Sequence, residues 1–584
     1  MNRPIQMEEV VNGIKNLKRG KASGFDGIKS EFYQTNNPIL VNAIHLIISQ
    51  IFSSGIYPEK WAKCMIIPLF KKGDHSQVTN YRGISLLDVL SKVFSQILQN
   101  RLKTWCDLNN LIPEEQAGFR KDYSTVDNIF SVNALVQKYI TKPKGRFYTL
   151  FVDFKVAFDS INRDKLWNVL HKNGCHGKML NILKSMYNNV MICVRVQQND
   201  MTHCNNTVYS QNLRSDFCIT ECFKSMSGVK QGCVLSPLLF NLYIAEIKEH
   251  FNESTIRHVP LLTNDTETSM LFYADDLAIF SDTVFDMQKK IDLLYTFCEK
   301  WGLTVNLDKT KMIVFRNGGY LKSIEKWSYG GVNIDTATYY SYLGMTFSSR
   351  LCWTQCLENY SCKALRMVSA MRKLFNTYKN IPIDIAFHIF DVKIKPMVLY
   401  ASQIWGFGYH ECIEKVQIQF CKAYLGVGKT TSNDLALVEC GRYSLSVEYN
   451  LTAVKYWTKL IYMNDERYPK KCYQQLKAHS DMGRTNWVSG IRNLLFSLGY
   501  GQVWIDQEQL SDVKLLLYDV KQRLIDIDLQ NLNSRIKNKS EIYFNYNSIN
   551  FYPSTNVVPY ICHNLSKSGG RSDSKVCGNG FFLQ

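Results

Sequence analysis

The feature that most constrains this chain is a pair of adjacent carboxylates, Asp275 and Asp276, set between two short apolar runs. The runs at 269–272 and 277–280 have the length and composition of buried β-strands, and Ala274 with the two aspartates can form the turn between them. Two ionised carboxylates beside a hydrophobic hairpin repel each other, and burial raises the cost of their charge. A divalent cation would relieve both effects, since Mg²⁺ prefers carboxylate and phosphate oxygens. The same pair is also typical of a solvated loop, so a second observation has to decide.

A third carboxylate occupies a matching position upstream. The β-rich apolar run 147–152 stops at Asp153, which predicts a core strand with a carboxylate at its C-terminal end. Rigid strand ends hold a metal site in place. Asp153, Asp275 and Asp276 are therefore candidate ligands of two Mg²⁺ ions, one activating an attacking hydroxyl and the other stabilising a leaving pyrophosphate. The alternative for Asp153 is a strand-end cap, and for Asp159 we favour a helix N-cap, because a helical segment follows.

Three stretches occur in a fixed order: 151–159 (FVDFKVAFD), 227–240 (SGVKQGCVLSPLLF) and 273–276 (YADD). Together they resemble the active-site motifs of reverse transcriptases from non-LTR retrotransposons, the LINE-type elements, and the resemblance covers roughly 8–456. It implies an α+β fold: a right-hand polymerase with fingers, a palm built on an antiparallel sheet and a helical thumb, then a mainly helical C-terminal region. The implied divisions are a lead-in helix and basic loop (1–40), fingers and palm (41–345), thumb (346–457) and a C-terminal region of uncertain fold (458–584).

The resemblance also implies roles for single residues. Phe158 matches the bulky position under the incoming sugar, where a ring collides with a 2′-hydroxyl and favours dNTPs over rNTPs. Lys309 matches a lysine near the leaving pyrophosphate, where an ammonium can donate a proton. Each of these residues also fits an ordinary core or turn position. The remaining implied contacts are Lys72 (with Lys71 as the alternative), Arg82 and Gln231 to the nucleotide, and Arg120, Lys121, Gly232, Tyr342 and Gly344 to template and primer.

Composition agrees with a nucleic-acid partner. Lys and Arg number 69 against 51 acidic residues, a net charge of +18, and such an excess favours a polyanion. Apolar residues make up 46% of the chain, enough for a packed core. The most apolar run, 39–52, is interrupted by polar residues, so we expect no membrane span and an intracellular protein of the nucleus and/or cytoplasm.

The cysteines predict reduced, buried thiols rather than disulfides or a zinc site. They are scattered without a paired framework, and many lie in apolar runs. The Cys and His residues near 203–222 and 562–577 lack a complete set of zinc ligands at usable spacing, so we expect no zinc. The thiols named on this basis are Cys64, Cys193 and Cys233, with Cys204, Cys218 and Cys222 as structural residues.

Local patterns add several expected elements. Ser236 is expected to cap a helix that has Pro237 in its first turn. Residues 302–315 predict a strand, a turn carrying Lys309 and a second strand, while 197–217 predicts a long surface loop and 528–550 a loosely ordered segment. Helices are expected at 7–17, 38–52, 91–102 and 287–301, and strands at 65–70 and 190–196.

The resemblance and the carboxylates together predict an RNA-directed DNA polymerase. It would extend a primer 3′-hydroxyl on an RNA template with dNTPs, using two Mg²⁺ ions (or Mn²⁺) and a DNA primer or target DNA. An RNA-dependent RNA polymerase or a group II intron-type reverse transcriptase would share the carboxylates. A decayed retrotransposon fragment that binds RNA without catalysis is the alternative from another class. Because the polymerase lead-in at 18–27 lies close to Met1, we expect no endonuclease domain here, whether the chain is a fragment or a nuclease acts from elsewhere.

Overall fold

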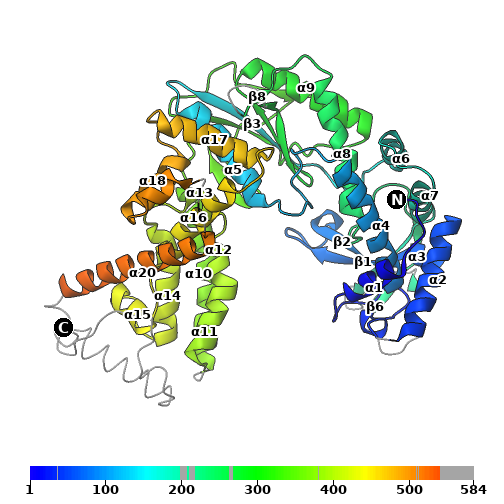
Figure 1. The fold of residues 1–584 in the computed structure, drawn as a ribbon, viewed down its shortest axis with the longest axis horizontal. Helices are drawn as coiled ribbons and strands as arrows, with labels where there is room; N and C mark the ends of the chain where they lie inside the picture. Colours follow the sequence, from blue (N-terminus) through cyan, green and yellow to red (C-terminus); the bar gives the residue numbers. More distant parts are fainter. Residues whose placement is uncertain are drawn as a thin grey trace.

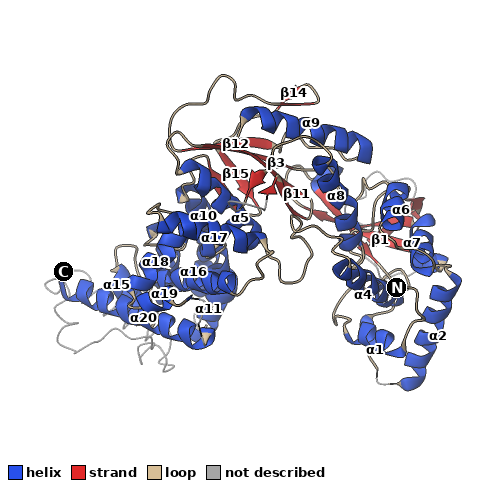
Figure 2. Ribbon diagram, turned by 45° about the horizontal axis from the view of Figure 1, so that its top comes forward, coloured by secondary structure: helices blue, strands red, loops and turns tan. Residues whose placement is uncertain are grey.

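The computed structural model describes residues 1–35, 37–197, 207–208, 217–261, 267–378, 381–507, 510 and 512–538. In Figure 1 the chain forms an arc, with the N-terminal elements at one end, a β-sheet in the middle and the C-terminal helices at the other end. Figure 2 shows the same division, with strands concentrated in the middle and at the N-terminal end and the last third entirely helical where it is described.

The N-terminal end packs helices against a small mixed sheet. Strand β1 (Lys63–Phe70) pairs antiparallel with β2 (Tyr81–Leu86) and parallel with β4 (Met191–Gln197). Strands β6 (Phe217–Thr220) and β7 (Phe223–Lys224) both pair with β4, and β5 (Thr207–Val208) lies outside β6. The helical elements here are α1 (Met7–Lys15), η1 (Ser30–Phe32), α2 (Pro38–Ser54), α3 (Glu59–Ala62), η2 (Val78–Asn80), α4 (Val89–Leu108), α6 (Arg163–Lys172) and α7 (Lys178–Asn188).

The middle of the arc is a four-stranded antiparallel sheet in the order β10-β11-β3-β12. Its strands are β10 (Met270–Tyr273), β11 (Asp276–Ser281), β3 (Arg146–Val152) and β12 (Lys311–Arg316). Successive side chains of β3 alternate between two cores, as strand geometry requires. Phe147 and Phe151 join the core that contains α5 (Thr125–Ile140), whereas Tyr148, Leu150 and Val152 join the core beneath α8 (Ser236–Asn252) and α9 (Val284–Trp301).

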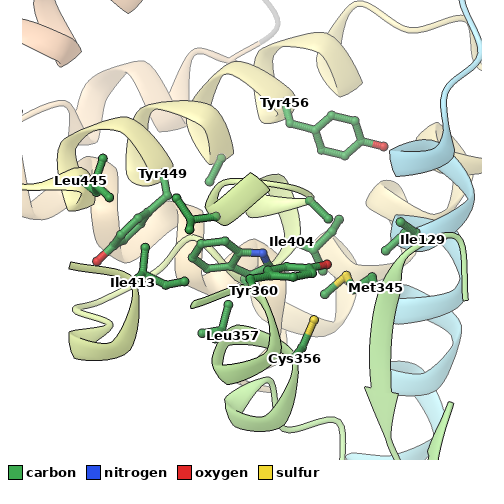
Figure 3. Packing of buried hydrophobic residues seen from close by; sticks show 14 of the residues in the cluster. Ile129, Met345, Cys356, Leu357, Tyr360, Ile404, Ile413, Leu445, Tyr449 and Tyr456 are labelled. Atoms are coloured by element: carbon green, nitrogen blue, oxygen red, sulfur yellow. The ribbon is translucent and has the colours of Figure 1, made fainter. Parts of the chain in front are cut away.

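The C-terminal third is a set of helices that shares its core with the middle sheet. Figure 3 shows side chains from α5 (Ile129), β16 (Met345) and the later helices (Tyr360, Ile404, Tyr449) gathered in one hydrophobic cluster. The helices are α10 (Thr354–Thr377), α11 (Ile383–Ile389), the π-helical turn η4 (Phe390–Ile394), α12 (Lys395–Val398), α13 (Ser402–Trp405), α14 (Glu411–Leu425), α15 (Asn433–Glu439), α16 (Leu445–Ile461), α17 (Tyr468–Asp481), α18 (Trp487–Ser497), α19 (Gly501–Ile505) and α20 (Val513–Asn538).

Three short hairpins complete the described fold. They are β8 (Val259–Pro260) with β9 (Glu267–Thr268), β13 (Ser328–Tyr329) with β14 (Val332–Asn333), and β15 (Tyr339–Tyr342) with β16 (Met345–Ser348). Within the described ranges, no helix is both long and apolar enough to cross a bilayer.

The expected helices and strands are confirmed apart from their ends, with four local corrections. Asn162, not Asp159, caps α6, and its side chain accepts a hydrogen bond from the Lys165 backbone. Ser236 is the first residue of α8 rather than its cap, and its hydroxyl donates to the Lys230 carbonyl oxygen. The first strand expected in 302–315 is reduced to a single bridge at Val305, and Asp528–Asn538 continues helix α20.

The cysteine prediction was wrong for one pair. Strand β7 pairs with β4 so that Ile192 lies opposite Phe223, which brings Cys193 opposite Cys222 at the next position, and the two form a disulfide. The pairing is invisible in the sequence because it depends on the register of two strands 29 residues apart. The other cysteines of the described ranges are free thiols, most of them buried. Most of the expected loop 197–217, and the Cys and His residues at 203, 204 and 562–577, lie outside the described residues.

Candidate active site

The register of the middle sheet brings the three predicted carboxylates to one corner. Strand β11 runs antiparallel to β3 with Leu277 opposite Val152, so the next position along each strand places Asp276 opposite Asp153. Such cross-strand neighbours have Cα atoms about 5 Å apart. Asp275 precedes Asp276 in the turn between β10 and β11, which confirms the predicted hairpin.

Asp153 is held by the turn that precedes β12. Its backbone N–H donates to the Thr310 hydroxyl at 3.1 Å, and its carbonyl oxygen accepts from the Asn306 backbone at 2.8 Å. One carboxylate oxygen accepts hydrogen bonds from the Asn306 side chain and from Lys309 Nζ, each at 3.2 Å. The Lys309 side chain is 61% exposed, so its ammonium reaches Asp153 from the solvent side.

The electrostatics of this corner are unfavourable for the carboxylates. Burial, followed by the charges of Asp275 and Asp153, raises the pKa of Asp276 to about 6, against the lowering effect of Lys309. Although Asp276 is reached by solvent, enough protein surrounds it for desolvation to be the largest cause. Burial and the charge of Asp153 also raise the pKa of Asp275, while Arg82 and Lys71 lower it. The corner holds more negative charge than its neighbours neutralise.

The donor chemistry fits a hard divalent cation, since all three side chains are carboxylates and like-charge repulsion is what such an ion removes. Within the described ranges, no three His, Cys, Asp or Glu side chains already stand in the geometry of a metal site. Asp153 instead faces Lys309. The fit therefore rests on ligand type, charge and register, not on a preformed coordination shell.

Two cations of the N-terminal sheet face the same corner. Arg82 lies on β2 opposite Leu69, and the Lys71 backbone N–H continues the pairing by donating to the Asn80 carbonyl oxygen. Because side chains alternate along a strand and the pairing continues to Lys71, Lys71 shares the face of Leu69 and Arg82. The charges of Lys71 and Arg82 both act on Asp275. Lys71, the alternative considered from the sequence, is thus near enough to act on Asp275, and the role expected of Lys72 stays a prediction.

Phe158, five residues beyond Asp153, has a partly exposed ring. It stacks on Phe240 with ring centroids 4.6 Å apart and meets Phe119 edge-on at 6.2 Å. Its carbonyl oxygen accepts a hydrogen bond from the Val229 backbone. The stacking on Phe240 restricts the movement of the Phe158 ring.

The loop before α8 ties the N-terminal sheet to the middle sheet. The Gln231 carbonyl oxygen accepts from the Ser85 backbone at 2.8 Å, and its side chain donates to Asp159 at 3.0 Å. Gly232 has a φ of +105°, and a Cβ there would lie 3.0 Å from the Ser85 carbonyl oxygen. The backbone at Gly232 therefore approaches β2 closely, and its implied contact with template or primer stays a prediction.

The two predicted template cations differ in their surroundings. Arg120 donates to the carbonyl oxygens of Pro113 and Gln116 at 2.9 and 3.1 Å and lies over the Tyr123 ring at 4.0 Å. Lys121 is exposed. Lys121 makes no such contact with the backbone of the described residues. Arg120 mainly stabilises the loop in which it lies.

The predicted primer-binding hairpin is β15–β16. Tyr342 is 2% exposed and packs on Phe151, so its ring belongs to the core. The turn is formed by Leu343 and Gly344, which have φ values of +48° and +82°. The hydroxyls of Tyr400 and Tyr360 donate to the carbonyl oxygens of these two turn residues.

Sequence reasoning missed one residue that contacts the catalytic turn. The sequence patterns predict no role for Gln116, yet its buried side chain bonds to the backbone of Ala274. The only sequence signal was a polar residue, Gln116, directly before the small residues Ala117 and Gly118.

An antiparallel sheet that gathers three carboxylates at one corner, faced by basic side chains, has the arrangement of a metal-dependent nucleotidyl-transfer domain. A known protein family matches the segment that carries this corner. Residues 70–347 match the family described as "Reverse transcriptase (RNA-dependent DNA polymerase)", a range that includes every carboxylate and cation of the corner. This segment of the chain is therefore similar to the reverse transcriptase family.

Curated relatives agree with this family and with the resemblance to retrotransposon enzymes. The chain is 25% identical over 426 residues to "Probable RNA-directed DNA polymerase from transposon BS" of Drosophila melanogaster, covering 71% of this chain and 44% of that protein. It is 24% identical over 426 residues to "RNA-directed DNA polymerase from mobile element jockey" of the same organism, covering 71% and 43%. The chain thus spans less than half the length of these relatives.

A solved structure of apo telomerase from Candida tropicalis, truncated from its C-terminal domain, is 14% identical. The match covers 54% of this chain and 59% of that one with a TM-score of 0.32, which is too low to establish a shared arrangement of the whole molecule.

Proposed function

We propose that this chain is an RNA-directed DNA polymerase of a non-LTR retrotransposon, which extends a primer 3′-hydroxyl on an RNA template with dNTPs. The observation that carries the proposal is the corner formed by Asp153, Asp275 and Asp276, inside the segment that matches the reverse transcriptase family. We propose an intracellular protein, of the nucleus and/or cytoplasm, whose partners are the RNA template and a DNA primer or target.

The three carboxylates are the proposed ligands of two Mg²⁺ ions, with Mn²⁺ as an alternative. When bound, these ions would lower the pKa of the attacking 3′-hydroxyl and neutralise charge on the transferred phosphate. The protein itself provides positioning and charge rather than a nucleophile. Lys309 Nζ, now 3.2 Å from Asp153, is placed to donate a proton toward the leaving pyrophosphate.

The nucleotide would lie between the two sheets. Lys71 and Arg82 face Asp275 from the N-terminal sheet, where their charges suit the triphosphate. Gln231 borders the same space from the loop before α8, and the Phe158 ring, supported by Phe240, would exclude a 2′-hydroxyl. These side chains lie far apart in the sequence, from Lys71 near the start of the family match to Lys309 near its end.

The right-hand arrangement follows as part of the proposal. The helices and mixed sheet of the N-terminal end would be the fingers, and the sheet β10-β11-β3-β12 with α5, α8 and α9 the palm. The β15–β16 turn would contact the primer, with residues 346–457 as the thumb and 458–538 as a helical region packed beside it.

The proposed thumb offers a basic groove for the nucleic-acid backbone. A cavity of about 520 Å³ runs between α10 and α14 and is lined by Arg372, Lys415 and Lys429, with no acidic side chain among its lining residues. Together with Lys121, these cations would neutralise phosphates without reading sequence.

The test is primer extension on poly(rA)/oligo(dT) with Mg²⁺ and dTTP. The proposal expects dTMP incorporation that stops when Mg²⁺ is chelated and that strongly exceeds UMP incorporation. Preference for rNTPs would point to an RNA-dependent RNA polymerase. Tight binding of the template without extension would point to a decayed fragment, and self-splicing of a bound intron RNA to a group II intron-type enzyme.

A further inference from the structure

The turn that presents Asp275 contains a backbone conformation that needs external support. Ala274 has a φ of +58°, the left-handed region that a residue with a Cβ rarely adopts. It is 7% exposed, so its N–H and C=O groups cannot rely on water. Residues in this conformation persist only where their surroundings over-determine them.

Gln116 supplies both missing partners with a single side chain. Its Oε1 accepts a hydrogen bond from the Ala274 N–H at 2.9 Å, and its Nε2 donates to the Ala274 carbonyl oxygen at 3.1 Å. The same Oε1 also accepts from the Gly118 N–H at 2.8 Å. Gln116 is 1% exposed. A primary amide carries an acceptor and a donor that can bond the N–H and the C=O of one residue at the same time.

The backbone around Gln116 follows β10 and brings the amide into position. The Ala117 N–H donates to the Phe272 carbonyl oxygen at 3.0 Å, and the Phe272 N–H donates to the Glu115 carbonyl oxygen at 2.7 Å. A Cβ on Gly118 would lie 2.2 Å from the Ala274 nitrogen. Only glycine therefore allows this approach, and the segment acts as a short extra strand at the edge of the sheet.

The segment is itself anchored from two other parts of the chain. Glu114 pairs with Arg467 at 2.9 Å, and Glu115 accepts from the Tyr468 hydroxyl at 2.7 Å, both at the start of α17. On its other side, Asn241 of α8 donates to the Gly118 carbonyl oxygen at 2.8 Å. The amide of Gln116 is thus tied to the body of the protein rather than to a free loop.

We infer that Gln116 is a positioning residue, whose carboxamide sets the Ala274 peptides and thereby the placement of the Asp275 carboxylate that follows. The inference rests on the proposed function, because it gives Asp275 a catalytic task. Gln116 does not touch the substrates or the reacting atoms. It acts through the turn.

The test compares Gln116→Met with Gln417→Met. Gln417 is a matched control: it is also 1% exposed, donates to a backbone carbonyl oxygen (Tyr443, 2.8 Å) and lies on α14, outside the corner. We expect both variants to lose similar thermal stability. Only Gln116→Met should lower kcat, by about 100-fold, with the KM for dNTP changed less than threefold, since a misplacement near 1 Å costs about this much.

A second measurement does not depend on activity. In metal-free protein, hydrogen–deuterium exchange of the peptide covering 272–277 should be at least tenfold faster in Gln116→Met than in wild type, because the Ala274 N–H loses its acceptor. Gln417→Met should leave that exchange unchanged. Equal kcat values in the two methionine variants, or unchanged exchange at 272–277, would overturn the inference.

Two further outcomes can be distinguished: misfolding of the variant and inactivity of the wild-type protein. If Gln116→Met does not fold, Gln116→Asn replaces it, since the shorter side chain keeps the amide but cannot reach both Ala274 groups, and the same loss of kcat and faster exchange are expected. If wild-type protein does not extend primers at all, the proposed function fails, while the exchange measurement still decides whether Gln116 holds the turn.

Discussion

The segment 114–118 lies between two groups of three acidic side chains. The two groups differ in how far nearby cations neutralise their charge. The first group, which we call the buried acid cluster, is Glu114, Glu115 and Asp127, and each member has a cation in direct contact. Arg467 lies 2.9 Å from Glu114, Lys248 lies 2.8 Å from Glu115 and Lys459 lies 2.9 Å from Asp127.

The second group is the corner of Asp153, Asp275 and Asp276, for which we propose a catalytic role. Its one ion pair is that of Asp153 with the exposed Lys309, and burial and mutual repulsion raise the pKa of both turn aspartates. The comparison shows that this fold places a cation against each carboxylate of the buried acid cluster. It leaves the corner short of positive charge, which is the state that favours binding of a divalent cation.

Removing a carboxylate from the corner should have the largest effect, and on activity alone. We expect Asp275→Asn to lower primer extension by about 10³-fold or more, the scale on which preorganised charge acts in catalysis. Stability should not fall, because an incompletely neutralised charge is removed. The measurement is steady-state primer extension beside thermal unfolding, with Asp335→Asn as the control, since Asp335 is 77% exposed at the sheet margin. Extension by Asp275→Asn within tenfold of wild type would contradict the assignment.

Removing a cation from the buried acid cluster should instead act on stability. Arg467→Met takes the partner from Glu114 and weakens the shell around Asp127, which is 2% exposed, and we expect a loss of about 3 kcal/mol in the free energy of unfolding. Chemical denaturation measures it. Arg535→Met breaks a more exposed pair with Asp434 and should cost less than about 1 kcal/mol. A similar cost for both variants would show that the buried cluster is not special.

Glu414 is a third case, a carboxyl that is buried but has no cation in contact with it among the described residues. It is 2% exposed, accepts from the Leu445 backbone at 2.8 Å, and burial raises its pKa to about 7. A carboxyl whose pKa is higher in the folded than in the unfolded state favours folding at low pH, and this contribution is lost as pH rises toward 7. Between pH 5.5 and 7 we expect it to lower the free energy of unfolding by about 2 kcal/mol.

The measurement is denaturant unfolding as a function of pH, with Glu414→Gln as the comparison. The variant should lack this part of the pH dependence and should be more stable than wild type above pH 7. Identical pH profiles for the two proteins would mean that Glu414 is neutralised after all.

The smallest expected effect distinguishes two adjacent lysines, Lys71 and Lys72. Lys71→Met should raise the KM for dNTP about tenfold, the worth of one charge-assisted hydrogen bond to phosphate, with kcat little changed. Lys72→Met should raise it less than threefold, because Lys72 lies beyond the pairing of β1 with β2 and is not among the main charges that act on Asp275. Steady-state kinetics with dTTP measure both, and a larger effect for Lys72 would restore the original assignment.

Most of the fold could be predicted because its elements follow local patterns. The hairpin around Asp275 and Asp276, the strand ending at Asp153 and the helices near 38–52 and 287–301 are encoded by runs of apolar residues with the period of a strand or helix. The errors lie where several local solutions are equivalent. Asp159 and Asn162 are both good caps, and tertiary packing selected Asn162 while Asp159 received the Gln231 side chain.

By itself, the sequence determined the kind of protein: three carboxylates in apolar surroundings, a basic composition and motifs in the order of a reverse transcriptase. Only the tertiary structure decided that Asp276 lies opposite Asp153, that Cys193 meets Cys222, that Lys71 faces Asp275 and that Gln116 holds the turn. The physical reason is range. Strand and helix patterns arise from neighbours a few residues apart, whereas register, facing and side-chain to backbone bonds join segments that folding alone brings together.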